Sequence, residues 1–287
     1  AKNVEITGIK IAYGPSWNVH MIYSDNVVTY DCTFESKGVH NGDGWDPDSS
    51  ENCTLFGCEF YTGDDSVAIK SGKNPEGNVI NRPSRHIRVF DCISHMGHGI
   101  TIGSEMSGGI KNINVTQCLF NQTDRGLRIK TRRGRGKQAV IDGITFENIK
   151  MDDVLTPLVV NMFYFCDPDG HSEYVWSKEK LPIDDRTPYL GKFVFKDIEC
   201  TNVNVAAGTF YGLPEQPIES ITLKNVNFSY SKNPVAGVPA MMDFLDPMKG
   251  QGLIFNYVNK VNLENVKFDG VSSEEVTLVN VQNFENK

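Results

Sequence analysis

A nine-residue pattern that returns along the whole chain constrains the fold more than any other feature. Apolar residues favour its second, fourth, seventh and ninth places. The change of phase between the fourth and seventh places indicates a strand, a one-residue bend and a second strand. Successive copies start about 23 to 49 residues apart. They begin at Asn3, Asn26, Asn52, His86, Asn112, Gly143, Lys192, Ser220 and Lys260.

All-β units that repeat at this spacing predict a solenoid, in which each unit packs mainly against its neighbours. An array of helical repeats would need apolar residues with a 3.6-residue period, which the chain lacks. A β-sandwich is the competing architecture, but it does not explain why the same change of phase returns in every copy. We therefore predict an all-β fold, a parallel β-helix, from which residues 163–190 and 231–252 project as loops.

The sixth and seventh places of the pattern predict where each coil bends and which side chains stack inside the β-helix. The sixth place is the bend, and its residues are mostly Gly, Asp or Asn, which tolerate left-handed backbone. Cysteine occupies the seventh place in four copies, so stacked coils would bring these thiols into one internal ladder. The bend residues are Gly8, Asp31, Gly57, Asp91, Asn148, Asp197, Asn225 and Asn265.

Composition limits the chemistry and the partners. The seven cysteines are an odd number without a CxxC pair, so we expect reduced thiols packed in the core rather than a metal site. A net charge of −8 argues against a general nucleic-acid binder. No apolar run approaches the roughly 20 residues of a membrane helix, so we expect no membrane span.

Four short polar signatures interrupt the repeat between residues 39 and 130. Three segments, 65–70, 98–103 and 125–130, superpose without gaps, and 43–48 fits the same frame one coil earlier. In a stack of coils this alignment places Asp43, Asp65 and His98 at one lateral position, with Arg128 and Lys130 beside them. The signatures are Asn41-Gly42-Asp43-Gly44, Gly63-Asp64-Asp65, Gly97-His98-Gly99 and Arg128-Ile129-Lys130.

Such a cluster of charges predicts acid–base chemistry. Neighbouring carboxylates repel one another and raise at least one pKa, which is what a general acid requires at neutral pH. Asn-Gly-Asp-Gly and Asp-Asp are also good turn sequences, and either one alone would be read as a turn. The set mixes acids, a histidine and bases on one face of a repeat, which favours a catalytic site.

In this order the signatures resemble the Asn-Thr-Asp, Gly/Gln-Asp-Asp, Gly-His-Gly and Arg-Ile-Lys motifs of glycoside hydrolase family 28, the polygalacturonases and their pectin-degrading relatives. Residues 15–20, Pro-Ser-Trp-Asn-Val-His, resemble a further segment of that family. The resemblance covers residues 13–165, and it implies a right-handed parallel β-helix. Gly42 departs from the family's Thr, and coils that usually precede this segment are missing. We therefore expect residues 1–287 to form one domain, the catalytic C-terminal portion of a longer β-helix.

The resemblance also implies a reaction, the hydrolysis of α-1,4-linked galacturonate with inversion, without a metal or other cofactor. It makes Asp64 the general acid that protonates the glycosidic oxygen. Asp43 and Asp65 correspond to the pair that holds and deprotonates the attacking water. His98 corresponds to the histidine that sets the protonation of the acid.

Arg128 and Lys130 correspond to the residues that bind the substrate carboxylate, and both are natural partners for a uronate. Tyr164 and Asn41 are further candidates for substrate binding. The basic residues around this pair could extend a positive patch, although a solvated loop is an equal alternative for those beyond Arg132. They are Arg125, Arg132, Arg133, Arg135 and Lys137.

The resemblance implies pectin or polygalacturonate as the partner, and a secreted or periplasmic location, although reduced cysteines leave a cytoplasmic one open. Inserted segments at 73–82 and 166–190 could wall off one end of the cleft, which leads us to favour exo action over endo action. A rhamnogalacturonan-type hydrolase, a Ca²⁺-dependent pectate lyase and a non-catalytic carbohydrate-binding β-helix are the alternatives.

Overall fold

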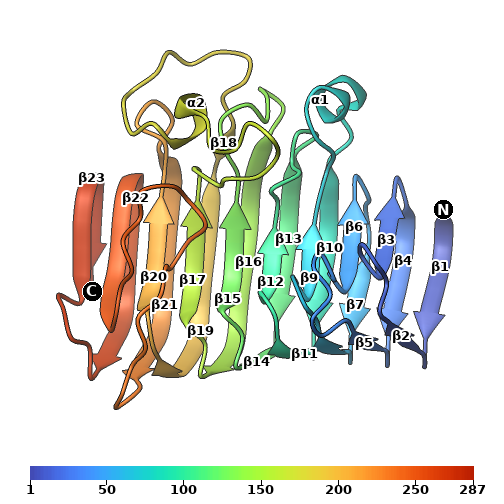
Figure 1. The fold of residues 1–287 in the computed structure, drawn as a ribbon, viewed down its shortest axis with the longest axis horizontal. Coiled ribbons are helices and arrows are strands. Elements are labelled where there is room, and N and C mark those ends of the chain that lie inside the picture. The colour runs from blue at the N-terminus through green and yellow to red at the C-terminus, as the bar shows by residue number, and fades with distance from the viewer.

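The computed structural model describes all residues 1–287 as a parallel β-helix, as the repeat predicts (Figure 1). Its strands form three series, and within each series neighbouring coils pair in parallel. The first series is β1 (Lys2–Thr7), β4 (Asp25–Tyr30), β7 (Thr54–Phe56), β10 (Ser84–Phe90) and β13 (Ile110–Thr116). The second is β2 (Lys10–Ala12), β5 (Thr33–Glu35), β8 (Glu59–Tyr61), β11 (Ile93–Met96) and β14 (Leu119–Asn121). The third is β3 (Val19–Ile22), β6 (Trp45–Asp48), β9 (Val67–Ile69), β12 (Ile100–Ile102), β15 (Arg125–Lys130), β17 (Thr156–Asn161) and β20 (Ala206–Tyr211).

Later coils have longer strands that continue through the bend. β16 pairs with β13 along one part of its length and with β14 along another, so it belongs to the first and second series at once. These strands are β16 (Val140–Asp152), β19 (Lys192–Val203), β21 (Ile218–Tyr230), β22 (Gln251–Asp269) and β23 (Val276–Asn286), and the two-residue β18 (Tyr189–Leu190) pairs with β16.

The predicted bends are confirmed. All eight predicted residues have a φ between 50° and 67°, the left-handed region that Gly, Asn and Asp enter most readily. Gln117, with a φ of 54°, makes the same bend in the fifth copy. The structure adds a second left-handed residue at the first place of most copies, such as Asn3, which the apolar pattern does not mark. Side-chain amides link successive bends, since Asn225 donates to Asp197 at 2.7 Å and Asn265 to Asn225 at 3.0 Å.

The core is one continuous cluster of apolar side chains along the stack. Phe34 and Phe60, at the ninth place of adjacent coils, stack with ring centroids 4.8 Å apart. The four seventh-place cysteines, residues 32, 58, 92 and 118, are buried, and all seven cysteines are free thiols, as predicted. Two seventh-place residues are less covered, since Ile9 is half exposed and Val266 is partly buried.

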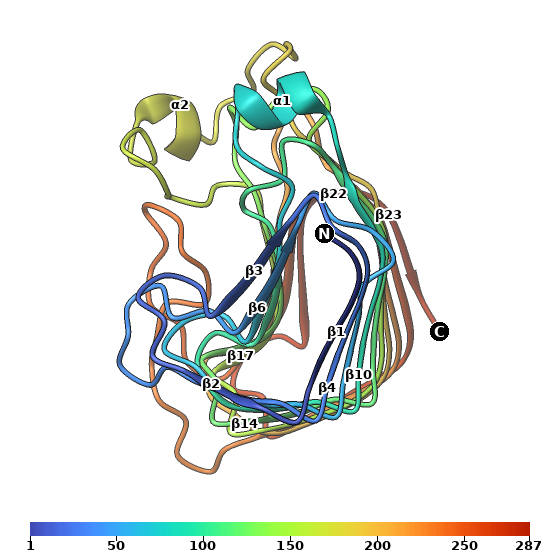
Figure 2. The ribbon, with the colours of Figure 1, turned by 90° about the vertical axis from the view of Figure 1, so that its right-hand side faces the viewer.

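Two large insertions and one small one project from the coils, as expected from the sequence. The segment 163–188 carries α2 (Glu173–Trp176), and 71–83 carries α1 (Glu76–Ile80). In the view along the stack, the 163–188 and 231–250 segments overhang the same side of the helix (Figure 2). These two segments therefore cover the flank that carries the third strand series.

None of the helices is long and apolar enough to span a membrane.

Candidate active site

The strands β6, β9, β12 and β15 lie side by side and set the register of the site. Trp45 pairs with Val67, Val67 with Ile100, and Ile100 with Leu127. This is the alignment predicted from the sequence. It places the residues two positions earlier, among them Asp43, at equivalent positions of consecutive coils.

Alternation along β15 separates core side chains from site side chains. Leu127 and Ile129 point into the core, and Arg128 and Lys130 point to the opposite face. Both basic side chains are nevertheless buried, because the insertions cover them. The ring of Tyr164 lies 5.4 Å from the Arg128 guanidinium and 5.0 Å from Lys130 Nζ.

A cavity of about 210 Å³ opens on this flank. Six of the eight site residues expected from the sequence line it directly. The other two, His98 and Arg128, contact those lining acids. The six are Asn41, Asp43, Asp64, Asp65, Lys130 and Tyr164.

Asp65 is the most firmly held acid of the site. Its carboxylate accepts from Thr101 Oγ1 at 2.6 Å, from Lys130 Nζ at 2.9 Å and from Arg128 Nη1 at 3.3 Å. Burial opposes ionisation, but the charges of Lys130 and Arg128 outweigh it and hold the pKa of Asp65 below its usual range. Asp65 is therefore an anion at neutral pH.

Asp64 faces the cavity and is joined to His98. His98 Nδ1 lies 2.9 Å from Asp64 Oδ1, and its Nε2 lies 3.5 Å from Asp124 Oδ2. Burial lowers the pKa of His98. The hydrogen bond to Asp64 and the charges of Asp124 and Asp65 together outweigh burial, so the pKa of His98 lies above the ordinary histidine value. A proton on His98 is thus stabilised next to Asp64.

Asp43 also lines the cavity and is buried. Burial, and then the charge of Asp65, raise its pKa, while Lys70 Nζ at 3.2 Å opposes the rise. Repulsion from a neighbouring carboxylate, the effect expected from the sequence, thus contributes to the raised pKa of Asp43, but it is second to burial. The acid concerned is Asp43, which the family resemblance makes a water-holding residue.

A buried lysine behind Asp43 is a site residue that the sequence analysis did not single out. Lys70 Nζ also lies 3.4 Å from Asp46 Oδ2, 3.6 Å from Glu105 Oε2 and 4.5 Å from the centre of the Trp17 ring. These carboxylates outweigh burial and raise the pKa of Lys70. Its place in the repeat, equivalent to Lys130, is a signal that could have found it.

Asp46 and Glu105 complete this cluster. Asp46 is fully buried, and burial raises its pKa well above the usual value. Its two carboxyl oxygens have no hydrogen-bond partner. Glu105 comes from the loop after β12, where no repeat pattern reveals it. Asp46 was visible in the aligned segment 43–48, but nothing in its spacing distinguishes it from a turn residue.

The basic residues expected to extend a positive patch are separated in the structure: Arg132 and Arg135 line a space beside the cavity, and Arg125, Arg133 and Lys137 line neither space. Arg133 is neither on the surface nor in the cavity, because it is fully buried and its Nε donates to Glu215 Oε1 at 2.6 Å. Arg135 Nη1 donates to Asp167 at 2.9 Å. Arg125 Nη2 donates to the Val238 carbonyl at 2.7 Å. Lys137 is exposed. Arg132, Arg135 and Lys137 face carboxylates of the 163–188 insertion, namely Asp169, Asp167 and Asp185.

The acids of the cavity fit a metal ion poorly. Asp64, Asp65 and His98 offer ligand atoms within 4.8 Å of one another. Lys130 and Arg128 already occupy the Asp65 carboxylate, and they would repel a cation. Ca²⁺ takes six to eight oxygen ligands, a set that two carboxylates and an imidazole do not approach.

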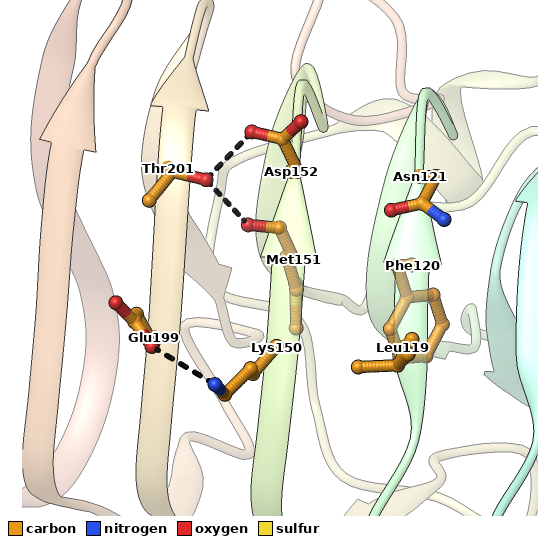
Figure 3. Close-up of a pocket in the computed structure, with 8 residues that line it drawn as sticks. All are labelled: Leu119, Phe120, Asn121, Lys150, Met151, Asp152, Glu199 and Thr201. Atoms are coloured by element: carbon orange, nitrogen blue, oxygen red, sulfur yellow. Dashed lines mark hydrogen bonds and ion pairs between the residues drawn. The ribbon is translucent and has the colours of Figure 1, made fainter.

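A second hollow, of about 320 Å³, lies over β14, β16 and β19 and shares no residue with the acid-lined cavity (Figure 3). Its polar side chains satisfy one another, since Thr201 donates to Asp152 at 2.6 Å and Lys150 lies 3.8 Å from Glu199. It therefore holds no group positioned for chemistry.

Fold and site together define a class, the glycoside hydrolases built on a parallel β-helix, with carboxylates for acid–base work and fixed cations beside them. The chain belongs to the glycosyl hydrolases family 28, whose model matches residues 1–241. It is 31% identical over 231 residues to a probable polygalacturonase of Vitis vinifera, covering 78% of this chain and 44% of the relative.

Two further relatives carry different names. An endo-polygalacturonase of Pectobacterium parmentieri is 29% identical over 232 residues, covering 80% of this chain and 51% of the relative. The crystal structure of a hyperthermoactive exopolygalacturonase of Thermotoga maritima matches with a TM-score of 0.76 and 27% identity, covering 96% of this chain and 54% of that one. The chain thus spans about half the length of these relatives.

Proposed function

We propose that this chain hydrolyses the α-1,4-galacturonosidic bonds of polygalacturonate by single displacement with inversion. The supporting observation is the cavity itself, which Asp43, Asp64 and Asp65 line together with Lys130 and Tyr164. Carboxylates supply acid and base catalysis, and the cation supplies a partner for the uronate.

In the proposed step, Asp64 gives its proton to the glycosidic oxygen as the bond from the anomeric carbon to that oxygen breaks. Water attacks the same carbon from the opposite face, and Asp43 and Asp65 accept the proton that the water loses. The anionic state of Asp65, held by Lys130 and Arg128, suits this role. His98, 2.9 Å from Asp64, is placed to return a proton to it after each turnover.

The substrate carboxylate would bind to Lys130 and Arg128 beside the scissile bond. These cations are already the partners of Asp65, so the uronate would share them with a catalytic acid. Tyr164, which packs against both cations, offers a ring face to the sugar. Names of relatives that include polygalacturonases support this substrate class.

Within this reaction we propose exo action. The two insertions expected to wall the cleft are joined by Lys73 Nζ and Asp167 Oδ1, 2.6 Å apart, and both residues line the cavity. Such a bridge restricts one side of the cavity, and a restricted cleft admits a chain end more readily than the middle of a chain. The relatives of this chain include one named as endo-acting and one named as exo-acting, so their names do not favour either mode. The proposal of exo action therefore rests on the bridge between Lys73 and Asp167.

Analysis of products over time on polygalacturonate tests this proposal. Saturated monomer or dimer as the first and continuing product would support exo hydrolysis. A ladder of oligomers would retain hydrolysis but overturn exo action. Products with unsaturated, ultraviolet-absorbing ends would identify a lyase, and binding without turnover would identify a carbohydrate-binding module. Either of these last two results would overturn the hydrolase proposal.

A further inference from the structure

The 231–250 segment places a methionine against one of the two cations proposed to bind the substrate carboxylate. Arg128 Nη2 donates to the sulfur of Met241 at 2.9 Å, while Nη1 of the same guanidinium donates to Asp65 at 3.3 Å. A thioether is a weak hydrogen-bond acceptor. A carboxylate is a far stronger acceptor for a guanidinium, so a substrate carboxylate can displace the sulfur from Nη2.

The backbone around Met241 holds the sulfur in this place. The Met241 carbonyl accepts a hydrogen bond from Asn161 Nδ2 at 3.0 Å, and Asn161 ends β17, the strand paired with β15. The flanking residues Ala240 and Met242 are buried in the apolar core. The position of the sulfur is thus set by its surroundings, and an oxygen added to it would stay beside the guanidinium.

Met241 is open to small solutes. It is partly exposed and lines a hollow of about 340 Å³, which shares no residue with the acid-lined cavity. Five of the eight methionines are buried, and Met96, Met241 and Met248 are partly exposed. Of these three, Met241 is the one whose sulfur accepts a hydrogen bond. A small oxidant can therefore reach this sulfur without entering the substrate site.

Oxidation changes the contact with Arg128 from a weak one to a strong one. Hydrogen peroxide transfers one oxygen atom to a thioether: a sulfur lone pair forms the new S–O bond, the O–O bond breaks, and water leaves. Sulfur is oxidised by two electrons and the peroxide is reduced. The product is a polar sulfoxide, whose oxygen is a much stronger acceptor than the thioether sulfur. A sulfoxide at this position competes with a carboxylate for the same N–H group.

We propose that Met241 is an oxidation site that controls access to Arg128. The thioether keeps the guanidinium in place until a uronate displaces it, whereas the sulfoxide retains the guanidinium and weakens substrate binding. The inference rests on the proposed function, since it concerns a cation assigned to the substrate carboxylate. It predicts a reversible loss of affinity, because methionine sulfoxide reductases regenerate the thioether.

The test treats the unmodified chain, Met241→Leu and Met248→Leu with hydrogen peroxide and then with dithiothreitol, and measures kinetics on polygalacturonate. Met248 is the matched control, a partly exposed methionine of the same segment. We expect KM to rise about tenfold in the unmodified chain and in Met248→Leu, and to change less than about twofold in Met241→Leu. The reductases for both sulfoxide epimers should restore KM, a reversal that excludes loss of the fold.

A further variant imitates the oxidised state without an oxidant. Met241→Gln places an amide oxygen near the position of the sulfoxide oxygen. We expect its KM to be raised before any treatment, and Met241→Leu should not show this rise. Equal KM values in the two untreated variants would contradict the proposed competition for Arg128.

The other outcomes separate the inference from the proposed function. If the untreated chain hydrolyses no polygalacturonate, the proposed function fails. If peptide mass spectrometry finds Met248 oxidised and Met241 not, or if Met241 sulfoxide forms and KM stays unchanged, the inference alone is wrong. An equal rise in KM in Met241→Leu would assign the effect to another group, such as the Cys166 thiol that lines the acid-lined cavity, and would also overturn it.

Discussion

Lys130 Nζ lies 2.9 Å from Asp65 Oδ2, so the cation proposed to bind the substrate carboxylate is also the partner of a proposed catalytic acid. Arg128 repeats the relationship at 3.3 Å. Substrate binding and the charge state of Asp65 are therefore coupled, since a uronate that draws on these cations changes the environment of the acid.

Substitution of Lys130 by methionine tests this coupling. We expect KM for polygalacturonate to rise about tenfold or more, because a charge-assisted contact is lost. We also expect kcat to fall, because Asp65 loses the charge that holds its pKa low. Steady-state kinetics on polygalacturonate measures both. A rise in KM with an unchanged kcat would show that Lys130 binds substrate without influencing Asp65.

The buried Lys70 should act as a positioning residue that sets the pH dependence. Its charge opposes the rise in the pKa of Asp43, so Lys70→Met should raise that pKa further. If Asp43 works as an anion, the acid limb of kcat/KM then moves to higher pH. Profiles from pH 3 to pH 8 measure the shift, with Lys150→Met, an exposed lysine on the hollow of Figure 3, as the control. An acid limb that stays in place would exclude this role.

His98 and Asp64 should make stability depend on pH in a predictable direction. The folded state raises the pKa of His98, so this stabilisation is fully present below the unfolded value of about 6.5 and is lost as pH rises through the folded value. Urea unfolding of the unmodified chain and of His98→Gln should differ by about 1 kcal/mol at pH 5.5 and by less at pH 8.5. A difference that grows with pH would contradict the pairing.

The buried pair of Arg133 and Glu215 should anchor the 163–188 insertion. Besides Glu215, Arg133 donates to the carbonyls of Ser177 at 2.7 Å and Glu179 at 3.1 Å. Glu215→Ala leaves a buried guanidinium without its counterion, so we expect a loss of about 3–5 kcal/mol in the free energy of unfolding. Glu199→Ala, at an exposed pair, should cost less than about 1 kcal/mol. Equal effects in urea unfolding would show that the pair is not structurally important.

The repeat made the strands and their register predictable, because coils that stack must align equivalent places. The match of Val67, Ile100 and Leu127 is an example, and it is enough to bring Asp43, Asp65 and His98 to one flank. The bends at the sixth place were predictable for a related reason, since few residue types accept left-handed backbone.

The walls of the site were not predictable in this way. Glu105 and Asp167 lie in loops that do not repeat, so no periodicity relates them to the coils beneath. Arg133 pairs with Glu215, 82 residues away in the turn between β20 and β21, which comes near only when the coils have stacked. A local charge pattern therefore suggested a patch where the structure has ion pairs.

The turnover of Asp64→Asn on polygalacturonate tests the central claim most directly. The amide keeps the shape of the side chain but cannot donate an acidic proton, so we expect the release of reducing ends to fall by roughly 10²–10⁴-fold. Binding of oligogalacturonate should remain within a few-fold of the unmodified chain. A rate near that of the unmodified chain would show that Asp64 is not the proton donor and that the assembled acids do not work as proposed.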